Sequence, residues 1–114
     1  MEKTTEYGNI KISDNVFERL IKEGLSLTEG RDSLVLERKN IIINETDNEL
    51  LLEFHVVHKF GTSMFFSTRT VLDYIEKNLK GLKLGKQIRV VMRIVAIKAR
   101  RSFKTNHEIT RVIK

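Results

Sequence analysis

Alternating and helically spaced apolar residues in the second half of the chain predict a strand, a long helix and a second strand. Residues 50–57 alternate, and the apolar side chains expected on one face are Leu50, Leu52, Phe54 and Val56. Between Met64 and Leu82 apolar residues recur every three or four positions, which predicts an amphipathic helix. Its expected stripe consists of Phe65, Thr68, Leu72, Ile75, Leu79 and Leu82. Residues 86–99 predict the second strand, and the rest of the chain is expected to cover or extend this unit.

Both faces of that last strand carry apolar residues, which favours a central strand or one covered on both sides. One face is expected to hold Ile88, Val90, Met92, Ile94 and Ala96, and the other Arg89, Val91, Arg93, Val95 and Ile97.

Shorter patterns predict the elements of the first half. Residues 8–12 alternate and predict a half-buried strand. Ser13 or Asp14 can accept hydrogen bonds from the first free amides of a helix, and Gly24 suits its end. The apolar face of that helix is expected to contain Val16, Phe17, Leu20 and Ile21.

The next segment predicts one or two strands and a hairpin. Residues 33–37 and 40–44 indicate two short strands, or one strand interrupted at Arg38 and Lys39. The polar residues 45–49 predict the turn that leads into the strand at Leu50.

Together these elements predict an α+β fold, with two helices packed on one face of a small, mainly antiparallel sheet in the order β-α-β-β-β-α-β. We expect this domain to span residues 1–99 and a basic tail to span residues 100–114. Residues 108–113 of the tail can form an extra strand or stay disordered until bound. The second sheet face mixes charged and apolar residues, so a partner or the tail is expected to cover part of it.

Composition agrees with one globular domain. The chain has 114 residues, of which 40% are hydrophobic and 32% charged, and it contains no cysteine. A disulfide framework and a thiolate metal site are therefore excluded. Because no apolar run reaches the roughly 18 residues of a membrane span and residues 1–6 lack the apolar core of a signal peptide, we expect a cytoplasmic protein.

The positive charge is concentrated in the C-terminal third. Residues 77–114 hold twelve Lys or Arg against Glu108 alone, a net charge of +11, which leaves −5 for residues 1–76. Such a split favours contact with an acidic partner. The candidate contacts to an anionic partner are Lys83, Lys86, Arg89, Arg93, Arg100, Arg101 and Lys104. A solvated basic face, an acidic patch on another copy, and nucleic acid with Phe103 stacking on a base are the open interpretations.

No motif indicates catalysis. His55 and His58 are three positions apart on a predicted strand, so they face opposite sides and do not share a metal. Residues 81–85 lack the Gly-Lys-Ser/Thr ending of a phosphate-binding loop, and there is no Gly-x-Ser-x-Gly elbow. We therefore expect no enzyme activity, no cofactor and no metal.

Three segments carry a resemblance to a known family. Gly8-Asn9-Ile10-Lys11-Ile12-Ser13-Asp14-Asn15-Val16 resembles the opening motif of the alkaline shock protein family, the Asp/Gls-type envelope stress response proteins. The segments 52–61, with its Val-Val-His-Lys-Phe-Gly ending, and 87–97 resemble the family's second motif and closing strand.

The resemblance implies a non-enzymatic scaffold that self-associates as a homo-oligomer. It also implies docking to a membrane-anchored protein partner, so that the protein is peripheral at the membrane without inserting into it. No catalytic residue is implied. The alternative hypothesis is a small basic nucleic-acid-binding accessory protein that uses the C-terminal third.

Overall fold

The computed structural model describes residues 2–5, 8–11, 14–29, 33–59, 64–98 and 101–114. Its elements are β1 (Glu2–Thr5), β2 (Gly8–Lys11), α1 (Asp14–Ser26), β3 (Ser33–Glu45), β4 (Glu49–Lys59), α2 (Met64–Gly81), β5 (Gln87–Lys98) and β6 (Ser102–Ile113).

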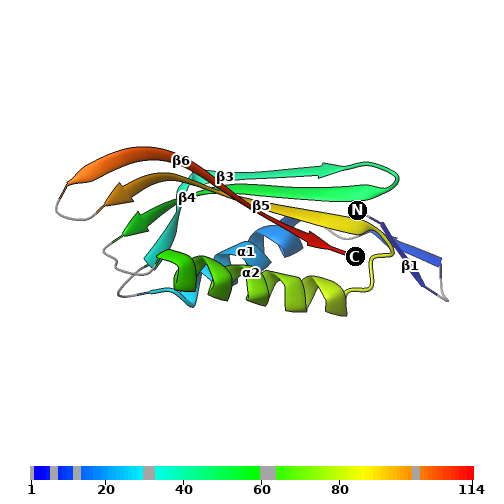
Figure 1. The fold of residues 1–114 in the computed structure, drawn as a ribbon. Helices are drawn as coiled ribbons and strands as arrows, with labels where there is room; N and C mark the ends of the chain where they lie inside the picture. Colours follow the sequence, from blue (N-terminus) through cyan, green and yellow to red (C-terminus); the bar gives the residue numbers. More distant parts are fainter. Residues whose placement is uncertain (1, 6–7, 12–13, 30–32, 60–63, 99–100) are drawn as a thin grey trace.

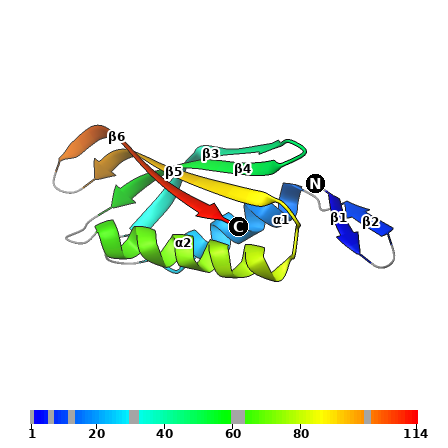
Figure 2. The same ribbon diagram turned by 45° about the vertical axis from the view of Figure 1, so that its right-hand side comes forward.

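Four strands form a mixed sheet in the order β3-β4-β5-β6, while β1 and β2 form a separate antiparallel pair. The neighbours β4 and β5 are parallel, and the other two pairs of the sheet are antiparallel. A parallel pair needs a long crossover, and α2 provides it. Figures 1 and 2 show α1 and α2 on the same face of the sheet, which confirms the α+β class.

The predicted order of elements was wrong, because the described elements run β-β-α-β-β-α-β-β. Residues 33–45 are a single strand, since β3 pairs with β4 on both sides of a register shift between Leu36 and Ile41. The predicted tail spans residues 100–114, of which Arg100 lies outside the described part. Its residues 102–113 enter the sheet as β6, which pairs with β5 from Ile88 to Lys98.

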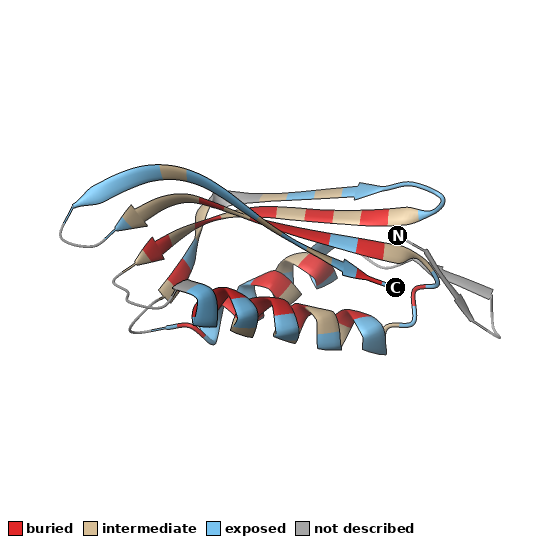
Figure 3. Cartoon of the chain, viewed as in Figure 1, coloured by how far each residue is buried: buried red, intermediate tan, exposed pale blue. Residues whose placement is uncertain are grey.

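The core lies between the sheet and the two helices. In β4 burial alternates as predicted, and Leu50, Leu52, Phe54 and Val56 are all fully buried (Figure 3). The core also contains facing residues of β5 and of the two helices, among them Ile88, Val90, Met92, Ile94, Phe17, Ile21, Val71, Leu72, Ile75 and Leu79. Each such side chain contributes roughly 1.5–3 kcal/mol by leaving water.

Two predictions about the helices were wrong: Gly24 does not end α1, and Phe65 is not buried. Gly24 lies inside α1, where a Cβ atom would come within 3.2 Å of Cδ1 of Tyr74 in α2, so glycine permits the helices to approach. Val71 is buried because α2 packs against α1 as well as the sheet, whereas Phe65 in the first turn is 77% exposed instead of buried. The bond from the Tyr74 hydroxyl to Oε2 of Glu23, 2.7 Å long, joins the same two helices and raises the pKa of Tyr74.

A bulge in β5 changes which side chains share a face. At Val95 the pairing register of β5 shifts relative to both of its neighbours, β4 and β6. After this shift Ala96 pairs with Val57, and Ile97 pairs with the buried His58. The alternation expected from sequence therefore ends at Ile94. Beyond the bulge, Ile97 lies on the helix-covered side and Ala96 on the other side.

Candidate functional site

The face of the sheet opposite the helices is open. No helix or strand among the described residues lies against it, and Figure 1 shows both helices on the other side. Its apolar residues include Val35 (40% exposed), Ile42 (45%) and Val112 (42%). These side chains give the face partly exposed apolar positions at both of its edges.

Ion pairs separate those apolar positions. Arg93 donates hydrogen bonds of 2.9 Å to Glu108 and 2.7 Å to Asn106, both in β6. Nε of Arg89 lies 3.3 Å from Oε1 of Glu49, and Nε2 of His55 lies 3.1 Å from Oε2 of its neighbour on β4, Glu53. The open face therefore combines partly exposed apolar side chains with polar groups that pair with one another.

The outer edge of β6 is the second uncovered feature. In the described part of the chain β6 pairs with β5 alone, so the backbone groups along its other edge have no strand partner. Most of its side chains are exposed, and only Ile113 is buried. A long unpaired edge is a template for pairing with another chain.

A groove runs between this edge strand and α2. It has a volume of about 390 Å³ and is lined by Phe65, Thr68, Arg69, Leu72, His107, Ile109 and Arg111. The groove exists because the two helices do not fully cover the inner side of β6. Its lining combines the apolar side chains of Phe65, Leu72 and Ile109 with the basic residues Arg69, His107 and Arg111.

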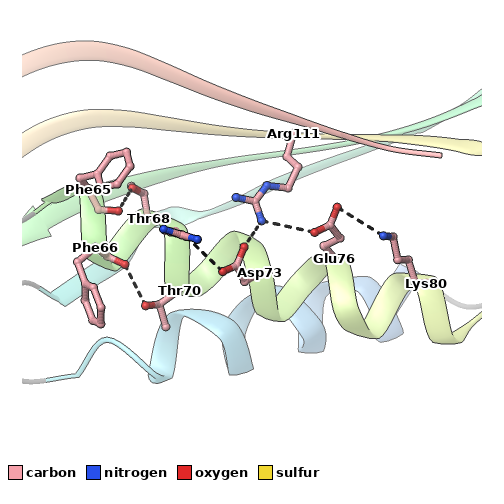
Figure 4. A network of polar contacts seen from close by, with 9 residues as sticks. Phe65, Phe66, Thr68, Thr70, Asp73, Glu76, Lys80 and Arg111 are labelled. Carbon is pink, nitrogen blue, oxygen red and sulfur yellow. Dashed lines mark hydrogen bonds and ion pairs between the residues drawn. The ribbon is translucent and has the colours of Figure 1, made fainter.

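Polar contacts join Arg111, one of the groove residues, to α2 (Figure 4). Nη1 of Arg111 donates to Asp73 and lies 3.7 Å from Oε2 of Glu76. Asp73 also lies 3.8 Å from Nε of Arg69, and Glu76 lies 4.0 Å from Nζ of Lys80. Such pairs each contribute about 0–1 kcal/mol, and the two made by Arg111 join β6 to α2.

The predicted basic contacts do not form one continuous stripe. Lys86, Arg89 and Arg93 are each paired with an acidic residue, and Lys86 donates a 2.6 Å bond to Glu45 that lowers the pKa of that carboxyl. Lys83 and Lys86 lie before β5, where they line a pocket of about 560 Å³ with Lys80 and Lys114.

The remaining candidates lie at the opposite end of β5. Arg101 and Lys104 are exposed in and beside the start of β6, and no described acidic residue pairs with either. Phe103 between them is 56% exposed. Arg100 lies outside the described residues. The structure thus spreads the described candidates along the whole length of β5 and into the start of β6.

The two histidines of β4 do not lie on one face of the sheet. His55 and His58 point to opposite faces of β4, as predicted, since His58 is buried on the helix side. Among the described residues there is no cluster of three His, Cys, Asp or Glu. No helix in the described ranges has the length and apolarity needed to cross a membrane.

Sequence reasoning missed the groove. Phe103 and Ile109 were visible as apolar residues in a polar segment, but only the topology shows that β6 is an edge strand beside α2.

Comparisons with family models, with curated proteins and with solved structures each found no match to this chain.

Proposed function

We propose that this chain is a non-enzymatic interaction protein that self-associates and docks to a membrane-anchored protein partner. The observation that carries the proposal is the incomplete covering of the sheet, which leaves the β6 edge, its groove and the open face exposed. The resemblance of residues 8–16, 52–61 and 87–97 to the alkaline shock protein family supports the same function.

The two uncovered surfaces suit different partners. An unpaired strand edge binds another extended strand through main-chain hydrogen bonds. The open face instead offers Val35, Ile42 and Val112 around ion pairs, the mixture of apolar and polar groups found in protein–protein interfaces. We assign self-association to the edge and the membrane-anchored partner to the open face.

Sedimentation with membrane vesicles from the native cells tests the docking. The purified chain is expected to sediment with untreated vesicles and to stay in the supernatant when the vesicles have been treated with protease, because the partner is a protein. The double substitution Val35→Glu and Ile42→Glu places charge on two exposed positions of the open face and should weaken sedimentation at least about 10-fold.

Leu27→Glu is the matched control, since Leu27 is 55% exposed and lies after α1, away from the open face. It should sediment like the unmodified chain. The docking proposal fails if the unmodified chain never sediments, if protein-free vesicles bind it equally well, or if the open-face variant binds normally.

A further inference from the structure

We propose that two copies of this chain pair antiparallel along β6, around a twofold axis at Asn106, and that Phe103 of each copy enters the groove between α2 and β6 of the other. The proposal rests on the proposed self-association and gives it a strand, a register and an anchor residue.

The faces of β6 restrict the possible registers. Pairing with β5 places Phe103, His107, Ile109 and Arg111 on the helix side, and Lys104, Glu108 and Thr110 on the open side. A twofold axis perpendicular to the sheet keeps each face on its own side. Residues that meet across the axis must therefore come from the same face of β6.

An axis at Asn106 gives compatible pairs from Ser102 to Thr110, and the like-charged Arg101 and Arg111 meet only beyond them, where Arg101 precedes the strand. It places Lys104 opposite Glu108 on the open side, and Phe103 opposite Ile109 on the helix side. Ser102 then lies opposite Thr110. Symmetry makes each of these pairs occur twice, and opposite charges and apolar pairs are the favourable cross-strand neighbours.

Neighbouring registers lack this match. An axis at His107 places Phe103 opposite Arg111 and Ile109 opposite Thr105. An axis at Glu108 brings the two Glu108 carboxylates together, which is unfavourable. The pairing of β6 with β5 is irregular between Lys104 and His107. In the Asn106 register this stretch lies at the twofold axis, opposite the same stretch of the second copy.

The charges agree with the Asn106 register. Glu108 already accepts a 2.9 Å bond from Arg93, whereas no described acidic residue pairs with Lys104. In the pair, Lys104 of the second copy approaches Glu108 from the side opposite Arg93. Each carboxylate then lies between two cations.

The groove gives Phe103 a place to bind. Phe103 is 56% exposed on the helix side of β6, and the residue opposite it, Ile109, lines the groove with Leu72 and Phe65. A volume of about 390 Å³ accommodates a phenyl ring. Burial of two such rings removes a large apolar area from water, and a buried aromatic anchor is the usual centre of binding energy in an interface.

Analytical ultracentrifugation of charge variants of the full chain tests the register. Lys104→Glu places a second carboxylate opposite Glu108 in both symmetric pairs, and Glu108→Lys places a second ammonium opposite Lys104. Each variant alone should therefore dissociate about 10- to 100-fold more readily than the unmodified chain. An equimolar mixture of the two variants restores an opposite-charge arrangement at both pairs. The mixture should form heterodimers near the original affinity.

Phe103→Ala tests the anchor. It should weaken self-association at least about 10-fold while the midpoint of thermal unfolding of the monomer stays unchanged. Phe66→Ala is the matched control, because Phe66 is 70% exposed but does not line the groove, and it should associate normally.

The outcomes separate this proposal from the broader function. If the unmodified chain associates but the mixture of charge variants does not recover, the Asn106 register is wrong and self-association stands. If the unmodified chain stays monomeric at about 100 μM, a concentration that populates weak dimers, both self-association and this pairing are wrong. Vesicle sedimentation continues to test the docking independently in either case.

Discussion

At the scale of single residues, the phenylalanines show how position outweighs residue type. Phe17 and Phe54 are fully buried, whereas Phe65, Phe66 and Phe103 are 77%, 70% and 56% exposed. Phe65 has the helical spacing of a core residue. It lies in the first turn of α2, however, where it lines the open groove between α2 and β6. Spacing predicts the side of the helix, and neighbouring elements decide whether that side is covered.

The same substitution at two of these positions should therefore have very different effects on stability. Phe54→Ala leaves a cavity in the core and is expected to lower the free energy of unfolding by about 3–5 kcal/mol. Phe65→Ala removes an exposed side chain and should change it by no more than about 0.5 kcal/mol. Denaturant melts of the two variants give both values, and equal losses would contradict the position of the core.

At the scale of elements, one hydrogen-bonded group joins the β3–β4 hairpin to the start of β5. Nζ of Lys86 donates to Oε1 of Glu45 at 2.6 Å and to the carbonyl oxygen of Thr46 at 2.9 Å. The amide of Thr46 in turn donates to the carbonyl oxygen of Glu49 across the turn. These bonds hold the start of β5, which is the parallel neighbour of β4, against the turn between β3 and β4.

The effect of removing this lysine should depend on pH. Lys86 lowers the pKa of Glu45 below its ordinary value of 4.5, so the contact stabilises the fold above that value and is lost as the pH falls through the lowered pKa. Lys86→Met is expected to cost about 0.5–1 kcal/mol at neutral pH. The cost should become smaller at acidic pH, where Glu45 is protonated and only the bond to the Thr46 carbonyl is lost.

Urea melts of the unmodified chain and the Lys86→Met variant at neutral and at acidic pH measure this difference. Lys83→Met is the control, because Lys83 precedes β5 without an acidic partner among the described residues. A loss at Lys86 that is independent of pH would show that the ion pair is not its cause.

At the scale of the whole molecule, β6 belongs to the fold. Ile113 is buried in the main core, Ile109 packs against it, and Arg111 contacts Asp73 of α2. Removal of this strand would expose the edge of β5, whose residues include the buried Ile88 and Met92.

A chain that ends at residue 99 is therefore expected to lose at least about 3 kcal/mol of stability, as for the loss of one or two large core side chains. Circular dichroism during thermal melting measures the loss, and substitution of Lys114 by Ala at the exposed terminus is the control. An unchanged melting midpoint would mean that the fold does not need β6 and that residues 100–114 behave as the tail expected from the sequence.

The amino-acid pattern by itself determined the elements whose period is long and regular. The alternation of Leu50, Leu52, Phe54 and Val56 and the spacing of Leu72, Ile75 and Leu79 report directly which face of each element avoids water. The α+β class and the helical stretch of α2 follow from these local periods.

Tertiary structure alone decided the rest. Whether residues 33–45 are one strand or two depends on β4, which pairs on both sides of the irregular stretch. Which strands form the two edges of the sheet depends on how the strands are ordered in space. Which cations have acidic partners depends on contacts between different elements, such as Arg93 of β5 with Glu108 of β6. A local pattern carries no information about such distant neighbours, and for this reason the groove beside Phe65 became visible only in the folded chain.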